Sequence, residues 1–534
     1  MSRPSDHIDP GQAAPAEEVR GVRLGVVGWL RWAWRQITSM RTALILLLLL
    51  AIAAIPGSIV PQRSSDPNGV TQYFADNADL APWLDRFQLF DVYTSAWFSA
   101  IYLLLFISLV GCVIPRAKHH WDALRGAPPA TPQNLNRLPA HLSASMPGTS
   151  PAEVIAAAER ILRRDRYRVR RYDTSERLTV SAERGYLRET GNLVFHVALV
   201  GVLIAVGFGG GFGFTGQRVV VEGQAFTNSL ISYDTFSPGR FFSATDLTPF
   251  SITLDKFTTL YEERNVNAVG QPIDYTADVT TEVRGSDPIK QVIKVNDPLR
   301  IGGADVYLLG NGYAPAVTVR DPAGNVVYQE MVPFLPQDRN LTSVGVVKLP
   351  DGLSKQVGLI GFFYPTVSAG HSGAFFSMYP DLLDPLVTFN VYVGDLGLND
   401  GVPRSVYALD TSKLTKLTGT KTDLPSLELR PGETAQLPNG MGSVSLDSVK
   451  RFASLDVHRD PTQGWVLAFA LAAVAGLLTS LFIPRRRVWI SARATSGGTV
   501  VEYAALARGD DPTLSEALTR IATAHGSDLG LVRE

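Results

Sequence analysis

Four long apolar blocks interrupt this sequence and constrain its fold more than any other feature. They cover residues 42–60, 96–115, 191–212 and 464–484, and none contains Lys, Arg, Asp or Glu. A membrane-spanning helix needs about 20 mostly apolar residues. A core helix of a globular protein rarely stays uncharged on all faces over that length. The sequence therefore predicts an integral membrane protein with four spanning helices.

The basic residues between these blocks predict their orientation. Residues 61–95 contain two Lys or Arg, whereas residues 116–190 contain fourteen, and Arg485–Arg487 follow the last block at once. Lys and Arg beside spans favour the cytoplasmic side. We therefore expect both termini, 1–41 and 485–534, in the cytoplasm. Residues 61–95 and 213–463 are expected outside it. A basic run is also compatible with RNA binding, but its position beside span ends favours the topological interpretation.

Charge and cysteine content exclude several function classes. The net charge is −1, which gives no support for nucleic-acid binding. The single cysteine, Cys112, forms no internal disulfide, and no CxxC or Cys/His zinc pattern is present. The first residues are polar and include Asp6, Asp9, Glu17 and Glu18, which is not typical of a cleavable signal peptide. The first span is therefore expected to remain as an anchor in the cell membrane.

The segments on the predicted cytoplasmic side are short. Residues 116–190 are expected to form a small α+β module, with a helix from Ala152 to Arg164 and a hairpin over 167–181. The tail 485–534 predicts one further short helix, from Pro512 onward, of unknown use.

The large insertion 213–463, between the third and fourth spans, is typical of a β-rich domain. Short strand-like runs separated by Gly, Pro, Asp and Asn predict a sandwich or a barrel-like stack of sheets. The predicted strands are 217–221, 250–254, 275–283, 291–295, 316–320, 325–328, 386–393, 427–429 and 443–446. No GxSxG, HExxH, P-loop or GxGxxG motif in a suitable context is present, so no catalytic residue is assigned. The overall fold class is an α+β membrane protein.

Most of the eight histidines have an ordinary interpretation. His7 and His525 lie in polar terminal segments, and His141 lies in a Pro/Ala-rich linker, so solvent exposure is expected for all three. His119 and His120 follow the second span and are expected at the membrane interface rather than as ligands. His371 lies in a Gly/Ser loop, for which a surface position is expected.

His196 and His458 are the candidate ligands. His196 lies inside the third span, where an ionisable side chain usually faces a partner or a pathway. It either bonds a neighbouring helix or serves as an axial ligand to haem or another metal. His458, six residues before the fourth span, is a weaker candidate. The two are expected near opposite faces of a hydrocarbon layer about 30 Å thick, whereas imidazole–metal bonds are about 2 Å. A haem on His196 would therefore take its opposite ligand from another chain or lack one.

Several motifs, in their order along the chain, carry a resemblance to a known family. They are SMRTAL (39–44), AIPGSIVPQ (54–62), FDVYTSAWF (90–98), LVGCVIPR (109–116), ERGYLRETGNLVFH (183–196), VEGQAF (221–226), VNDPLRIGG (295–303) and GDLGL (394–398). Together with the four spans, they resemble the ResB family of cytochrome c biogenesis proteins of system II. The resemblance runs from about Arg35 to Trp489.

The resemblance implies a subunit of a holocytochrome c synthase complex that helps carry haem outward for attachment at CxxCH motifs. It places the intramembrane haem ligand on His196, leaves His458 as a weak candidate, and implies transient haem b and no other metal. The implied partners are a ResC (CcsA-type) membrane protein, apocytochrome c and, indirectly, a thioredoxin-like thiol reductant. The eight tryptophans are scattered, so the chain resembles the ResB half alone. The alternative is a non-catalytic scaffold that binds apocytochrome or partner proteins without contacting haem.

Overall fold

The computed structural model describes residues 25–370, 373–398 and 407–530. The chain divides into two compact units, one holding residues up to Ile204 and from Trp465 onward, the other holding Ala205–Gly464. Each unit has hydrophobic clusters of its own.

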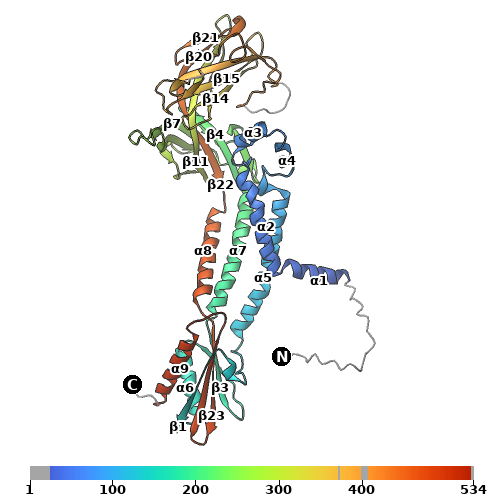
Figure 1. Cartoon of the computed structure of the whole chain (residues 1–534), viewed down its shortest axis with the longest axis vertical. Helices are drawn as coiled ribbons and strands as arrows, with labels where there is room; N and C mark the ends of the chain where they lie inside the picture. The colour runs from blue at the N-terminus through green and yellow to red at the C-terminus, as the bar shows by residue number, and fades with distance from the viewer. Residues whose placement is uncertain (1–24, 371–372, 399–406, 531–534) are drawn as a thin grey trace. The chain divides into compact units, whose positions relative to one another are not determined.

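Four helices among the described residues are long and apolar enough to cross a membrane (Figure 1). They are α2 (Met40–Ile59), α5 (Ala96–Arg125), α7 (Leu187–Phe212) and α8 (Gln463–Phe482). The prediction of four apolar helices is confirmed, and the chain is a multi-pass membrane protein. Helix α5 differs from the expectation because it continues past Pro115 to Arg125. Proline removes a single backbone donor, and the helix tolerates that loss here.

Small residues let the long helices of the first unit approach closely. A Cβ atom on Gly191 of α7 would lie 2.7 Å from the carbonyl oxygen of Gly476 on α8. On α5, a Cβ atom on Gly111 would lie 2.1 Å from Cγ2 of Thr38. Such close approaches at glycine are typical of helix packing in membranes, where no hydrophobic force drives association. The α7–α8 contact fixes the turn of α7 that precedes His196.

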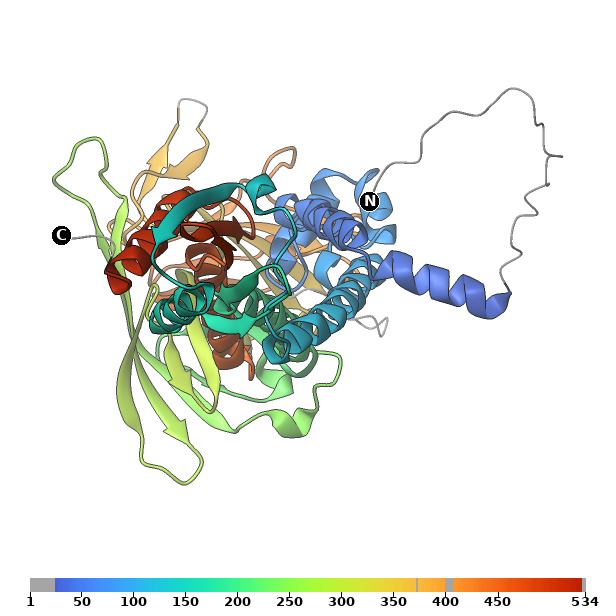
Figure 2. The same cartoon turned by 90° about the horizontal axis from the view of Figure 1, so that it is seen from below.

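Shorter helices flank α2 and α5 in the first unit. They are α1 (Val26–Ile37), α3 (Pro67–Asp76), α4 (Ala81–Arg86) and η1 (Val92–Thr94). Residues 61–95 therefore form a small helical segment that packs around its own cluster of Val70, Ala81 and Phe90. Helix α1 extends away from α2 and α5 and buries none of its residues (Figure 2). Its exposed tryptophans are Trp29, Trp32 and Trp34.

A five-stranded domain is built from two distant parts of the sequence. Its strands are β1 (Ala140–Pro147), β2 (Arg168–Arg171), β3 (Leu178–Arg184), β23 (Arg486–Thr495) and β24 (Gly498–Ala507), in the order β1-β24-β23-β3-β2, with η2 (Leu135–Arg137), α6 (Pro151–Arg164) and α9 (Leu514–Asp528). The predicted module 116–190 and the predicted tail 485–534 are thus one domain. Strand β23 pairs with β3 from Arg486 to Ala492. The tail supplies two of the five strands, which its sequence did not reveal.

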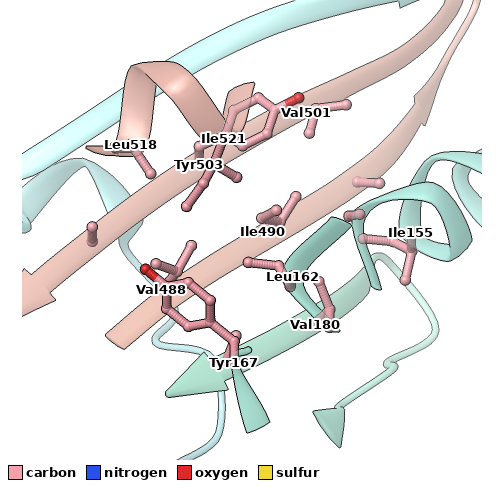
Figure 3. Packing of buried hydrophobic residues seen from close by; sticks show 14 of the residues in the cluster. Ile155, Leu162, Tyr167, Val180, Val488, Ile490, Val501, Tyr503, Leu518 and Ile521 are labelled. Atoms are coloured by element: carbon pink, nitrogen blue, oxygen red, sulfur yellow. The ribbon is translucent and has the colours of Figure 1, made fainter. Parts of the chain in front are cut away.

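Helices α6 and α9 cover one core of the five-stranded domain (Figure 3). Ile155 and Leu162 of α6 and Ile521 of α9 pack on the sheet. The capping box of Ser150 and Glu153 begins α6.

Two histidine predictions for this domain are wrong. His525 is fully buried: its Nε2 donates to the carbonyl of Val154 at 2.8 Å, and the hydroxyl of Tyr503 donates to Nδ1 at 2.7 Å. Burial lowers the pKa of His525. His141 lies half-buried in β1, not in a linker. Both positions depend on strands that pair over long sequence distances.

The second unit is β-rich, as predicted. Its strands are β4 (Phe214–Val221), β5 (Ala225–Thr227), β6 (Thr235–Pro238), β7 (Phe250–Tyr261), β8 (Pro272–Val283), β9 (Ile289–Lys294), β10 (Leu299–Ile301), β11 (Ala304–Arg320), β12 (Val326–Met331), β13 (Leu335–Pro336), β14 (Ser343–Leu349), β15 (Val357–Tyr364), β16 (Val367–Ala369), β17 (Phe375–Ser377), β18 (Leu386–Val393), β19 (Thr415–Lys416), β20 (Leu427–Leu429), β21 (Thr434–Gln436) and β22 (Ser443–Arg459), with η3 (Leu230–Ser232), η4 (Ala244–Asp246) and η5 (Pro438–Gly440). Strands β11 and β22 pair from Asp305 with His458 to Arg320 with Ser443. Residues from one half of this strand pair belong to one hydrophobic core, and residues from the other half belong to a second core.

Candidate functional site

His196 lies on α7 with a defined ring orientation. Its Nδ1 is 2.7 Å from the carbonyl oxygen of Asn192, one helical turn earlier. A carbonyl only accepts, so Nδ1 carries the proton and donates it, and in the neutral ring Nε2 keeps its lone pair. This is the tautomer that a metal-binding imidazole uses, with the second nitrogen held by an acceptor. No described residue occupies Nε2 through a hydrogen bond.

A pocket of about 510 Å³ adjoins His196, and we name it the α5/α7 pocket. Its lining residues come from α5, α7, β23 and the segments next to β23 and β24: Val113, Arg116, His119, His120, Ala123, Glu189, Asn192, Leu193, His196, Arg485, Arg487 and Arg508. Its volume lies within the usual range for sites that bind small molecules. Apolar side chains and arginines both line it, so the pocket suits an amphipathic ligand with negative charge.

His120 brings a second imidazole to this pocket, and one ring nitrogen lacks a partner. Its Nε2 is 2.9 Å from the hydroxyl oxygen of Thr190, and that hydroxyl donates to the carbonyl of Tyr186 at 3.3 Å. The hydroxyl proton is therefore used, and the Thr190 oxygen accepts from Nε2. The Nδ1 lone pair of His120 is buried and has no hydrogen-bond partner among the described residues. Such an atom is costly unless something satisfies it.

Ion pairs organise the arginine side of the pocket. Arg485 is buried and contacts Glu183 at 2.8 Å and Glu189 at 3.1 Å. Arg487 contacts Glu183 at 2.9 Å, and Arg508 pairs with Glu189. Burial opposes the charge on Arg485, but the two carboxylates raise its pKa. Burial likewise acts to raise the pKa of Glu183, but Arg487 and Arg485 hold it below its ordinary value.

The arginines of the pocket outnumber the carboxylates that pair with them. Arg116, Arg485, Arg487 and Arg508 line it, and among the described residues only Glu183 and Glu189 form ion pairs with this group. Four positive charges less two negative charges leave a net charge of +2 with neutral histidines. The side chain of Arg116 is exposed, and its guanidinium donates to the sulfur of Met40 at 3.2 Å.

His458 lies in a different setting, in the second unit. It is half-buried on β22, and its Nδ1 is 3.0 Å from the hydroxyl oxygen of Thr215 on β4. Asp456 lies two residues earlier on the same strand face, and burial raises its pKa despite His458 and a hydrogen bond from Gln217. His458 does not line the α5/α7 pocket.

Sequence reasoning missed most of the pocket. It identified His196 but placed His119 and His120 at an interface and used Arg485 and Arg487 only for topology. A signal was present, since Arg116, His119 and His120 have the i, i+3, i+4 spacing of one helix face. His371 falls outside the described residues. Among residues that are described, no group of three or more His, Cys, Asp or Glu is placed to hold a metal ion.

Comparisons with known proteins agree on one family. A model described as the ResB-like family matches residues 40–519. The chain is 26% identical over 314 residues to cytochrome c biogenesis protein CcsB of Prochlorococcus marinus (strain AS9601), covering 57% of this chain and 66% of that protein. It is 27% identical over 480 residues to the protein of the same name from Paulinella chromatophora, covering 86% of this chain and 91% of that one. The match to the Prochlorococcus protein thus spans just under two thirds of its length.

Proposed function

Because the chain belongs to the ResB-like family, we propose that it acts in cytochrome c biogenesis as a membrane subunit of a cytochrome c synthase. It helps to carry haem across the membrane and presents it with apocytochrome c for covalent attachment at CxxCH. The relatives named cytochrome c biogenesis protein CcsB support the pathway. The observation that carries the haem role is the His196 tautomer, with a free Nε2 beside a pocket of about 510 Å³.

The proposed topology places the α5/α7 pocket at the cytoplasmic ends of the spans. The support is the excess of Lys and Arg in 116–190 and at Arg485–Arg487 over residues 61–95. Both termini and the five-stranded domain then lie in the cytoplasm. Residues 61–95 and the β-rich unit lie outside it, where apocytochrome c is matured.

The residues around His196 fit haem by their chemistry. A neutral imidazole nitrogen suits iron, guanidinium groups suit carboxylates, and the uncharged part of α7 suits a flat apolar ring. The orphaned Nδ1 of His120 is a further polar atom that a ligand would satisfy. Bound haem would supply the iron that His196 ligates and the vinyl groups to which the apocytochrome thiols add.

Within this chain, the other residues position His196. The Asn192 carbonyl holds the Nδ1 proton, which fixes the ring and leaves Nε2 facing outward from the helix. The Gly191–Gly476 contact fixes that turn of α7 against α8. His196 is the single histidine in the four predicted spans, and His120, which lines the same pocket on the longer α5, uses its Nε2 on Thr190. We therefore propose that the opposite ligand of a shared haem b comes from a ResC (CcsA-type) partner subunit, with a thioredoxin-like reductant acting on the apocytochrome thiols.

The test replaces His196 by Ala in the complex purified from membranes. We expect the haem content and the yield of holocytochrome to fall by more than about tenfold, because a ligand contributes at least as much as the groups that orient it. Added imidazole should restore part of the haem spectrum. His141→Ala, in the five-stranded domain, is the matched control. Unchanged haem content in His196→Ala would refute the ligand role.

A second function, a scaffold that binds apocytochrome without contacting haem, has one observation in its favour. Arg485, Arg487 and Arg508 are already paired with carboxylates, so these residues also have a structural role that needs no ligand. An absorbance scan of the purified complex separates the two functions. A haem held by two imidazoles gives a sharp α band on reduction, and a scaffold gives none.

A further inference from the structure

We propose that the arginine side of the α5/α7 pocket binds the two carboxylates of the haem, so that the porphyrin lies with its charged edge on Arg116 and Arg508 and its iron toward His196. This inference rests on the proposed function and deepens it. It gives a binding role to Arg116 and Arg508, neither of which was a candidate ligand from the sequence.

Charge balance is the first argument. The four arginines and their two paired carboxylates leave a net charge of +2 at the pocket. The two propionates of protoporphyrin IX carry a charge of about −2 at neutral pH, since carboxylates ionise near pH 4. Charge-assisted hydrogen bonds from guanidinium to carboxylate are among the strong ones, and Arg presents them as a planar fork.

The four arginines differ in their freedom to bind a ligand. Arg485 has 6% of its side chain exposed and is paired with two carboxylates, so its side chain is held in place. Arg508 has 68% exposed, and its pair with Glu189 is therefore screened by water. Arg116 is exposed and has no carboxylate partner among the described residues. Arg116 and Arg508 are thus the two groups that can turn toward an anion at little cost.

Distance along α7 gives the second argument. Glu189, which pairs with Arg485 and Arg508, lies seven residues before His196. Seven residues of α-helix rise about 10 Å. The carboxylates of a porphyrin lie together on one edge of a rigid disc, away from the iron at its centre. An arginine group two helical turns from the imidazole therefore matches a single ligand that bridges both.

His120 supplies the third argument. Its Nδ1 lone pair is buried without a partner, and the residue lines the same pocket. A buried polar atom without a partner on the lining of this pocket indicates a place where a ligand binds. An arginine pair alone would not explain why a histidine is buried there.

The experiment uses the purified full-length complex in nanodiscs of phosphatidylcholine, and two probes: iron protoporphyrin IX and its dimethyl ester. The variant is Arg116→Gln with Arg508→Gln, both at exposed side chains, and the control is Arg493→Gln on β23, also exposed. We expect the unmodified complex to bind the free acid at least about tenfold more tightly than the ester. The double variant should lose this preference and bind the ester as before, with an unchanged haem spectrum.

Three outcomes decide between the hypotheses. Equal affinity of the unmodified complex for acid and ester would overturn the carboxylate site, while a spectrum that depends on His196 would leave the proposed function intact. If neither probe gives a spectrum that depends on His196, the proposed function itself is refuted. The last outcome concerns nanodiscs that also contain phosphatidylglycerol. If this lipid weakens the binding of acid and ester equally, and the double variant abolishes that weakening, the arginines bind a lipid phosphate. The inference is then wrong.

Discussion

Two carboxylates, one paired with arginines of the α5/α7 pocket and one near His458, have pKa values shifted in opposite directions. Glu183 of β3 is buried, and although burial acts to raise its pKa, Arg487 and Arg485 hold the pKa below its ordinary value. Asp456 of β22 is half-buried, and burial raises its pKa because His458 and a hydrogen bond from Gln217 compensate only in part. The difference lies in the partners and not in the burial.

This contrast separates two kinds of polar site. Permanent cations keep Glu183 ionised and build a charged wall, which the α5/α7 pocket then uses. The half-buried imidazole of His458 does not do the same for Asp456, whose pKa stays raised. The pocket beside His196 is therefore lined by charged groups in ion pairs, whereas His458 and Asp456 belong to a paired strand of the β-rich unit.

The largest expected effect comes from Glu183→Gln. The change leaves Arg485 buried with Glu189 alone and removes the partner of Arg487. Breaking a buried pair by removing one partner costs about 3–5 kcal/mol. We expect the free energy of opening of β3 and β23 to fall by about that amount, measured by hydrogen exchange on the full-length protein.

The control for this change is Glu516→Gln on α9, whose side chain is exposed. It should alter exchange by less than about 0.5 kcal/mol. If Glu183→Gln behaved like this control, the arginine wall would not depend on the ion pairs, and the contrast with Asp456 would fail.

Asp456→Asn should have a much smaller effect, with no loss of stability at neutral pH. The substitution removes a charge that burial disfavours and keeps an oxygen that accepts from Gln217. Its Oδ1 has no partner among the described residues, so no hydrogen bond is lost there. We expect the exchange of β22 amides to change by less than about 1 kcal/mol. A loss as large as that of Glu183→Gln would show that the carboxylate is ionised and paired.

The pH dependence of stability should have opposite signs at the two sites. For Glu183 the folded pKa is lowered, so its contribution is present above the ordinary value near 4.5 and is lost as the pH falls through the lowered pKa. For Asp456 the folded pKa is raised, so its contribution is present below the ordinary value near 3.8 and is lost as the pH rises through the raised pKa.

Exchange measured between pH 3 and pH 6 tests this difference, with each variant compared to the unmodified protein. Glu183→Gln should flatten the loss of stability of β3 toward acid. Asp456→Asn should flatten the loss of stability of β22 as the pH rises. Slopes of the same sign at both sites would show that the partners of the two carboxylates do not determine their ionisation.

The sequence predicted those features that depend on local pattern. The four spans follow from long uncharged runs, and strand β18 was predicted with its observed ends because its run 386–393 is bounded by turn residues. The five-stranded domain was missed because β23 and β24 pair with β3 and β1 across more than 300 residues, and no local pattern reports such pairing. The buried position of His525 was missed for the same reason.

The candidate site was predictable only in part. An ionisable residue inside a span is conspicuous, so His196 was found. The pocket is lined by α5, α7 and the start of β23. These elements are far apart in the sequence, and no local pattern predicts that they pack together. Arg485 was used only as a sign of orientation because a basic run beside a span is expected there. Its pairing with Glu183 depends on the register of β23 against β3.

The smallest expected effect, and the one that most sharpens the comparison of the two histidines, is that of His458→Gln. Glutamine can keep the hydrogen bond to Thr215, and the strand pairs with Asp305 and Thr215 through the backbone. We expect a stability change of less than about 0.5 kcal/mol and a haem content of the purified complex within about twofold of the unmodified protein. One nitrogen of the His458 ring is already bonded to a hydroxyl, and the residue does not line the α5/α7 pocket. Should His458→Gln instead lose haem as completely as His196→Ala, a free imidazole nitrogen beside a pocket would no longer distinguish a ligand from a structural histidine in this protein.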